Sequence, residues 1–207
     1  MRIIRLLVTV GFVAVYMGLA FPTVSTSFGE SGLRKHESGG LSFRYSSDLK
    51  IMSSSSAEKI RSMLNAQMKG MGNSQSSVLA LDVLLDLPAY RVLISKERFV
   101  AEPTPHFLIQ EKQYFFAEAK KRGAINSYGK IQEKSIAGYP TIEFKDIDKG
   151  AQGYGSTFTI LCGMDTWNFS FTGNNRENYE KHGDHMNRIM SSIEISGTCK
   201  RSDKVLS

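Results

Sequence analysis

The stretch "GYGSTFTILCGMDTWNFSFTG", residues 153–173, constrains the fold most strongly, because apolar and polar residues alternate through it in two runs. Successive side chains of a β-strand point to opposite faces, so a period of two indicates a half-buried strand. A short turn around Gly163 to Asp165 separates the two runs. We therefore predict a central antiparallel hairpin. The residues predicted to face the core are Tyr154, Phe158, Ile160, Cys162, Trp167, Phe169 and Phe171.

Weaker alternation predicts the other strands. These strands span residues 41–45, 78–87, 90–94, 131–136 and 140–145, with a closing strand at 193–195. Between two of them lies "AGYP", residues 137–140, where Gly138 permits a positive φ and Pro140 suits the first position of a strand. We interpret this segment as a strand connection rather than a catalytic loop. In the strand that follows, Glu143 is predicted to face solvent.

Three segments show the three- and four-residue spacing of an amphipathic helix, at 53–72, 104–123 and about 175–190. In the first of these helices, Ser55 and Glu58 fit a capping box. All three helices are expected to pack an apolar face against the sheet.

Several helix boundaries are also marked in the sequence. In the second helix, Thr104 is the predicted cap, Pro105 occupies the first helical position and Gly123 ends the helix. In the third, Gly183 costs roughly 1 kcal/mol in a helix interior. We therefore predict that this helix divides at Gly183, with Asp184 capping its second half.

The resulting order is strand, helix, two strands, helix, four strands, helix, strand. Short turns join consecutive strands, so the sheet is expected to be mostly antiparallel and covered by helices. The chain has 207 residues, 41% hydrophobic and 22% charged, which is ordinary for a globular protein of one domain. We predict an α+β fold with a single domain over residues 41–199 and a polar tail at 200–207.

The first 40 residues are predicted to precede this domain. Arg2 and Arg5 come before sixteen uncharged, mostly apolar residues, and a run of small residues follows. This order is typical of a secretory signal peptide, which we assign to residues 1–27, with cleavage between residues 25 and 28. An uncleaved anchor is the alternative, but a membrane span needs roughly 20 residues. The next segment, 28–40, is polar and rich in glycine and is predicted to be a flexible leader.

The charge distribution argues against nucleic-acid binding. The formal net charge of +6 falls to +4 once Arg2 and Arg5 leave with the signal peptide. The remaining basic residues are scattered, and their densest cluster is "KKR" at 120–122. Nucleic-acid-binding domains carry a basic patch or stripe instead. The cluster at 120–122 suits the C-terminal end of a helix, where cations interact favourably with the dipole.

No motif of a catalytic site occurs in the sequence, which lacks the hydrolase Gly-x-Ser-x-Gly elbow, the phosphate-binding glycine loop and the zinc-protease His-Glu-x-x-His. The cluster that most resembles a metal site is "EKHGDH", where His182 and His185 are three residues apart and could approach one Zn²⁺ from a helix. Such a site needs a third ligand, which the sequence does not identify. The alternative is a hydrogen-bonded core histidine at His182, because this residue falls on the apolar stripe.

The two cysteines, Cys162 and Cys199, form an even count in a chain predicted to be exported. A bridge between them would close the 36 intervening residues and add roughly 3.5 kcal/mol on the chain-entropy model. We favour this disulfide. A buried free thiol at Cys162 is the alternative, because Cys162 alternates onto the apolar face of its strand.

Four features occur in a recognisable order: a strand in "LSFRYSSDLKI", an "I-x-G-x-P" corner at 136–140, the aromatic hairpin at 153–172, and a helix followed by "SSIEI". In this order the chain resembles the PsbP-like superfamily of α/β/α sandwiches, with its Mog-type and DcrB-like members, over about residues 41–196. The resemblance implies a protein that acts by binding other proteins without catalysis. It transfers no site residues, because no ligand motif matches.

These observations predict an exported, non-catalytic binding or assembly module that contacts an envelope protein and needs no cofactor. Its predicted location is secreted or periplasmic, with no membrane span left after cleavage. No cysteine lies near the signal peptide, which excludes a lipid anchor on an N-terminal cysteine. The alternative is a small metal- or ligand-dependent enzyme centred on His182 and His185. The sequence does not indicate an oligomeric state.

Overall fold

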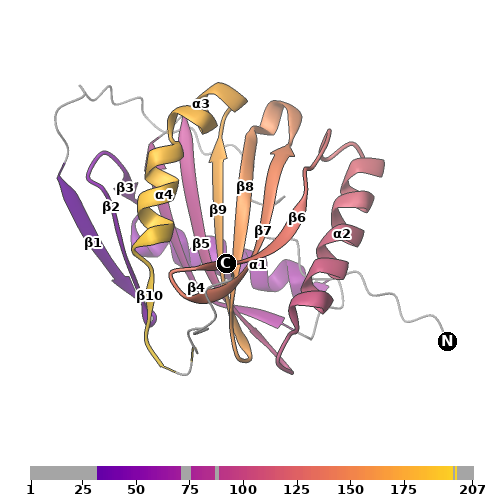
Figure 1. Cartoon of the computed structure of the whole chain (residues 1–207), viewed down its shortest axis with the longest axis horizontal. Helices are drawn as coiled ribbons and strands as arrows, with labels where there is room; N and C mark the ends of the chain where they lie inside the picture. Colours follow the sequence, from indigo (N-terminus) through magenta and orange to yellow (C-terminus); the bar gives the residue numbers. More distant parts are fainter. Residues whose placement is uncertain (1–31, 71–75, 87–88, 198, 200–207) are drawn as a thin grey trace.

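The structure, a computed structural model, describes residues 32–70, 76–86, 89–197 and 199 (Figure 1). A seven-stranded sheet has the order β3-β4-β5-β9-β8-β7-β6, and a three-stranded sheet has the order β1-β2-β10. Every pairing of these strands is antiparallel. The strands are β1 (Leu33–Ser38), β2 (Leu41–Ser46), β3 (Lys50–Ile51), β4 (Ser76–Asp86), β5 (Tyr90–Phe99), β6 (Ile131–Ile136), β7 (Tyr139–Asp148), β8 (Tyr154–Cys162), β9 (Asp165–Gly173) and β10 (Glu194–Ile195).

Helices lie on both faces of the large sheet. They are α1 (Ser54–Gly70), α2 (Pro105–Lys121), α3 (Arg176–Lys181) and α4 (Gly183–Ser191). In Figure 1, α3 and α4 lie in front of the seven-stranded sheet, α1 crosses behind it, and α2 stands beside β6. The predicted α+β fold, a mostly antiparallel sheet flanked by helices, is confirmed. No helix among the described residues is long and apolar enough to cross a membrane.

The predicted central hairpin is formed by β8 and β9, which pair from Tyr154 with Gly173 to Cys162 with Asp165. The turn between them is two residues long, and its first residue, Gly163, has a φ of 63°. Trp167 is 1% exposed and belongs to the core, as the alternation predicts. Tyr154 is half-buried and lies at the end of the hairpin.

The prediction of a flexible leader up to residue 40 is wrong for residues 33–38, which form β1 and pair with β2. The side chains of β1 are mostly exposed, so its sequence lacks the alternation of apolar and polar residues that predicts a half-buried strand. The signal that could have found it is the dipeptide Gly39-Gly40, whose φ angles of 56° and 89° suit a two-residue hairpin turn. The predicted signal peptide and the tail at 200–207 lie outside the described residues.

The boundaries of α2 are those predicted. Thr104 Oγ1 accepts a hydrogen bond from the Phe107 backbone N–H at 3.2 Å, and Pro105 is the first helical residue. Gly123 follows the helix with a φ of 69°. The strand connection after β6 is also confirmed, because Ala137 and Gly138 adopt φ values of 51° and 84° between β6 and β7.

Two other helix caps differ from the prediction. The cap of α1 is Ser53 rather than Ser55, because Ser53 Oγ accepts a hydrogen bond from the Ser56 backbone N–H at 3.4 Å. Glu58 forms an ion pair with Arg61 instead of capping the helix. The first turn of α1 holds no acidic residue, so a capping box cannot form there.

The third predicted helix divides into α3 and α4, as Gly183 suggests. Asp184 is not the cap, because it lies within the first turn of α4 and His182 occupies the cap position. Asn175 caps α3 by accepting from the Asn178 backbone N–H at 2.8 Å.

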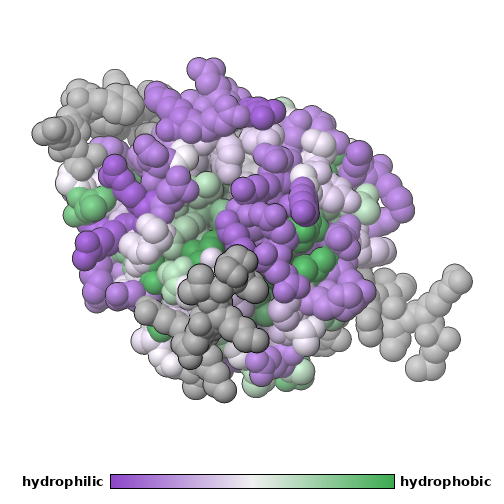
Figure 2. Space-filling model, viewed as in Figure 1, coloured by the Kyte–Doolittle hydropathy of each residue, from purple (hydrophilic) through white to green (hydrophobic). Residues whose placement is uncertain are grey.

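Both faces of the central strands of the seven-stranded sheet are buried. The front core joins β5, β8 and β9 to the small sheet and α4, and a second core joins α2 to β7. Figure 2 shows the front surface as largely hydrophilic, with hydrophobic side chains visible mainly near its centre. The prediction that Glu143 faces solvent is therefore wrong, because Glu143 is 1% exposed. Its carboxylate accepts from Lys134 Nζ at 2.9 Å and Gln132 Nε2 at 2.7 Å.

Gly173 allows α3 to pack directly on the sheet. A Cβ atom at this position would lie 2.4 Å from the Tyr179 backbone nitrogen. We expect Gly173→Ala to lower the free energy of unfolding by about 2 to 3 kcal/mol, because α3 must shift. Urea unfolding measures this change. Gly183→Ala is the control, since nothing lies within 4 Å of its Cβ, and an equal loss there would contradict the packing argument.

Candidate functional site

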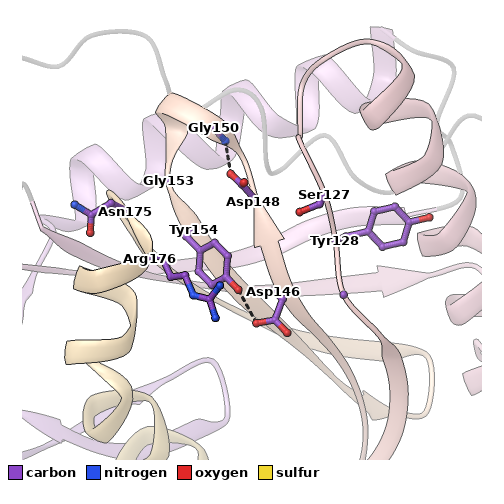
Figure 3. Close-up of a pocket in the computed structure, with 10 residues that line it drawn as sticks. Ser127, Tyr128, Asp146, Asp148, Gly150, Gly153, Tyr154, Asn175 and Arg176 are labelled. Carbon is purple, nitrogen blue, oxygen red and sulfur yellow. Dashed lines mark hydrogen bonds between the residues drawn. The ribbon is translucent and has the colours of Figure 1, made fainter.

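A surface pocket of about 540 Å³ lies at one end of the seven-stranded sheet, where β7 ends and β8 and α3 begin (Figure 3). Polar side chains, aromatic rings and glycine backbone line it. The lining residues are Ser127, Tyr128, Gly129, Asp146, Asp148, Gly150, Gly153, Tyr154, Asn175 and Arg176.

A β-bulge in β7 shapes the floor of this pocket. The pairing of β7 with β8 shifts between Phe144 and Ile147, and Asp146 within the bulge has a φ of 54°. A bulge bends its strand and redirects a side chain. Gly129 packs against this bulge, since its backbone N–H donates to the Lys145 carbonyl at 3.0 Å and a Cβ atom there would lie 3.0 Å from Asp146 Cβ.

Tyr154 and Asp146 form the hydrogen bond drawn across the pocket in Figure 3, where the phenol donates to Asp146 Oδ1 at 2.7 Å. The Arg176 guanidinium lies 5.4 Å from the centre of the Tyr154 ring, within cation–π range. Burial and the Asp146 carboxylate raise the pKa of Tyr154 to about 12. The phenol therefore stays protonated at neutral pH and acts as a fixed hydrogen-bond donor.

Asp148 holds the loop that follows β7. Its Oδ1 accepts from the Gly150 backbone N–H at 2.8 Å and from Asn126 Nδ2 at 3.3 Å. Asp146 and Asp148 are thus both engaged as acceptors that fix the wall of the pocket. Such a wall presents donors, acceptors and aromatic surface in defined positions, which suits recognition of a polar partner.

His182 and His185, predicted from the sequence as the weak metal candidates, do lie close together, with ring centres 5.3 Å apart. His182 is 5% exposed, and its ring stacks on Tyr90 at 4.5 Å with an angle of 9° between planes. Its Nδ1 lies 2.7 Å from the Asn178 carbonyl, so this nitrogen donates and is not available to a metal. Among the described residues, no group of three His, Cys, Asp or Glu side chains is arranged for a metal ion.

The arrangement therefore favours the core-histidine interpretation of His182. Sequence reasoning missed Tyr90, which is 1% exposed. Tyr179 lies three residues before His182 on the same predicted stripe, and its hydroxyl donates to Ser156 Oγ at 2.7 Å. Burial raises the pKa of Tyr90, so its phenol stays neutral beneath His182. The sequence holds no signal for this cluster, because Tyr90 comes from β5, distant along the chain from α3.

We expect His182→Ala to lower the free energy of unfolding by about 2 kcal/mol, because the stack on Tyr90 and the bond to Asn178 are lost. His185→Ala should cost less, since His185 is half-buried. Chemical unfolding with parallel metal analysis checks both variants. A stoichiometric metal in the wild type that is absent from each of the two variants would restore the metal-site hypothesis.

The favoured disulfide is present in the structure, between Cys162 at the end of β8 and Cys199 near the C-terminus. Their Cα atoms are 4.4 Å apart, and neither cysteine is free. Cys162 is 7% exposed and packs in the front core. The bridge therefore anchors the chain after β10 to the central hairpin.

No known protein family and no curated protein matches this sequence. Among solved structures, the chain is similar to cyanobacterial PsbP (CyanoP) from Synechocystis sp. PCC 6803, with a TM-score of 0.52 over 84% of this chain and 98% of that chain. The two sequences are 10% identical, so this similarity establishes the fold alone. The protein has a PsbP-like fold, as the order of its elements predicts.

Proposed function

We propose that the protein is an exported, non-catalytic binding or assembly module that contacts another protein of the cell envelope through the pocket lined by Asp146, Tyr154 and Arg176. Export and the envelope location rest on the signal peptide predicted for residues 1–27. The resemblance to PsbP-like proteins implies binding without catalysis.

The observation that carries the proposal is the hydrogen-bond network that fixes the polar side chains of the pocket. A general acid or base needs a pKa near the operating pH. The pKa of Tyr154 is instead raised to about 12, and its proton is held by Asp146. Asp148 is engaged by Gly150 and Asn126. These groups form a rigid polar wall, which suits a contact surface better than proton transfer.

Site-directed photo-crosslinking in the native host tests the proposal. A photoreactive residue replaces exposed Ser127 at the rim of the pocket, and a control replaces Met63, which is 53% exposed on α1. We expect one predominant protein adduct from position 127 in the extracytoplasmic fraction and none from position 63. Equal adducts from both positions, or none from position 127, would contradict a specific contact at this pocket.

The denaturing mass of the same isolated protein tests export separately. We expect a mature chain that lacks about the first 27 residues. A full-length chain retained in the cytoplasm would remove the envelope part of the proposal without bearing on the pocket.

We expect Tyr154→Ala to weaken the contact at least tenfold, because it removes the ring beneath Arg176 and the donor to Asp146. Tyr154→Phe keeps the ring and loses only the donor to Asp146, so it should weaken the contact less than Tyr154→Ala. Titration of the isolated partner with each variant measures the two dissociation constants. An alanine variant with unchanged affinity would place the contact elsewhere.

A further inference from the structure

The back face of the central strands is polar although it is buried. Side chains that alternate with the front core point to this face, and several of them are hydroxyls. Those buried to at least nine-tenths are Ser95, Thr157, Thr159, Thr166, Ser170 and Thr172. Buried polar groups are costly unless they are hydrogen-bonded, so a hydroxyl-rich interior face calls for an explanation.

Two lysines are buried on this side of the sheet, and their charged neighbours differ. Lys112 of α2 is 7% exposed and faces Glu97, whose negative charge offsets part of the effect of burial on the lysine. Lys149, after β7, is also 7% exposed. Burial lowers its pKa to about 7, and the neighbouring charge that lowers it further is the Arg91 guanidinium. A buried lysine beside a second cation is electrostatically unfavourable.

The strand register brings these cations to one place. Lys149 Nζ donates to Thr172 Oγ1 at 3.4 Å. Thr172 on β9 pairs with Arg91 on β5. The end of the back face therefore combines an ammonium group, a guanidinium group and a hydroxyl on adjacent segments.

A second hydroxyl near this place makes no hydrogen bond to any described residue. Thr157 is 2% exposed, and its Oγ1 has no partner in the structure. Thr157 pairs with Ser170, which lies two residues before Thr172 on the same face of β9. Its unused donor thus lies in the same polar tract as the two cations.

We propose that this end of the back face binds a small anion, one that carries a phosphate or carboxylate group, with Lys149, Arg91 and Thr172 as its ligands and Thr157 beside them. An anion there would lie beside two positive charges and accept hydrogen bonds from Lys149, from Arg91 and from the hydroxyls. Lys149 and Arg91 make further contacts within the protein, and their positive charges and adjacent positions are what suit them to an anion. This site is separate from the proposed protein contact.

Calorimetric titration of the full mature chain with inorganic phosphate, at constant ionic strength and pH 6.5, tests the site. Succinate in a parallel titration distinguishes a carboxylate from a phosphate preference. We expect saturable binding of at least one of these anions to the wild type. Lys149→Met should weaken that binding at least tenfold, and Lys149→Arg should retain it.

Two further variants keep the test decisive if Lys149→Met alters the fold. Thr157→Val preserves shape and should weaken anion binding several-fold while raising the urea midpoint without anion. Lys120→Met removes an exposed lysine of α2 and should change neither property. Absence of saturable binding to the wild type, or an equal affinity in the wild type and a folded Lys149→Met variant, would overturn the proposal.

Discussion

The free energy of unfolding of the wild type is expected to rise by about 4 kcal/mol relative to that of Lys149→Met between pH 6.5 and 10. Burial and Arg91 lower the folded-state pKa of Lys149 to about 7, whereas an unfolded lysine titrates near 10.4. Between these values the unfolded state binds more protons, so stability increases with pH. Urea unfolding of both proteins at several pH values, in buffers without phosphate, measures the difference.

The sign of this effect separates a buried lysine from a surface ion pair. Below pH 7 the buried ammonium carries its full desolvation cost, so Lys149→Met should be the more stable protein there. Lys120→Met, which removes an exposed lysine, is the control for loss of a lysine side chain without burial. If the free energies of unfolding of wild type and Lys149→Met change with pH in the same way, Lys149 keeps an ordinary pKa in the folded protein.

Much of the fold follows from periodicity, because burial of one strand face or helix stripe leaves a pattern in the sequence. The β8 and β9 hairpin and the boundaries of α2 are predicted for this reason. The β1 strand is not, because its stability comes from backbone pairing at an exposed edge. Glu143 is assigned to solvent by alternation, whereas the structure buries it because both faces of β7 are covered.

The candidate sites were less predictable than the fold. The sequence identifies His182 and His185 because they are near one another along the chain, yet Tyr90, which defines their environment, comes from the distant strand β5. The Asp146 pocket and the Lys149 tract depend on a bulge in β7 and on cross-strand register. Neither feature has a signature in single-sequence periodicity.

Loss of the disulfide should cost about 3 to 4 kcal/mol of stability, because the unfolded chain regains the entropy that closing the loop removes. The bridge joins residues 37 positions apart. Cys199→Ser is the cleaner variant, since it leaves a thiol at Cys162, which a buried apolar site tolerates. Urea unfolding of wild type and variant, each with and without a reducing agent, measures the loss.

The reducing agent distinguishes the bridge from the side chains that form it. The urea midpoint of the reduced wild type should be close to that of Cys199→Ser. The midpoint of Cys199→Ser should not change when the reducing agent is added. Cys162→Ser should lower the free energy of unfolding more than Cys199→Ser does, because it also places a hydroxyl in the front core, where Cys162 is 7% exposed. If reduction leaves the wild type unchanged while Cys199→Ser is destabilised, Cys199 acts through its contacts after β10 and not through the bridge.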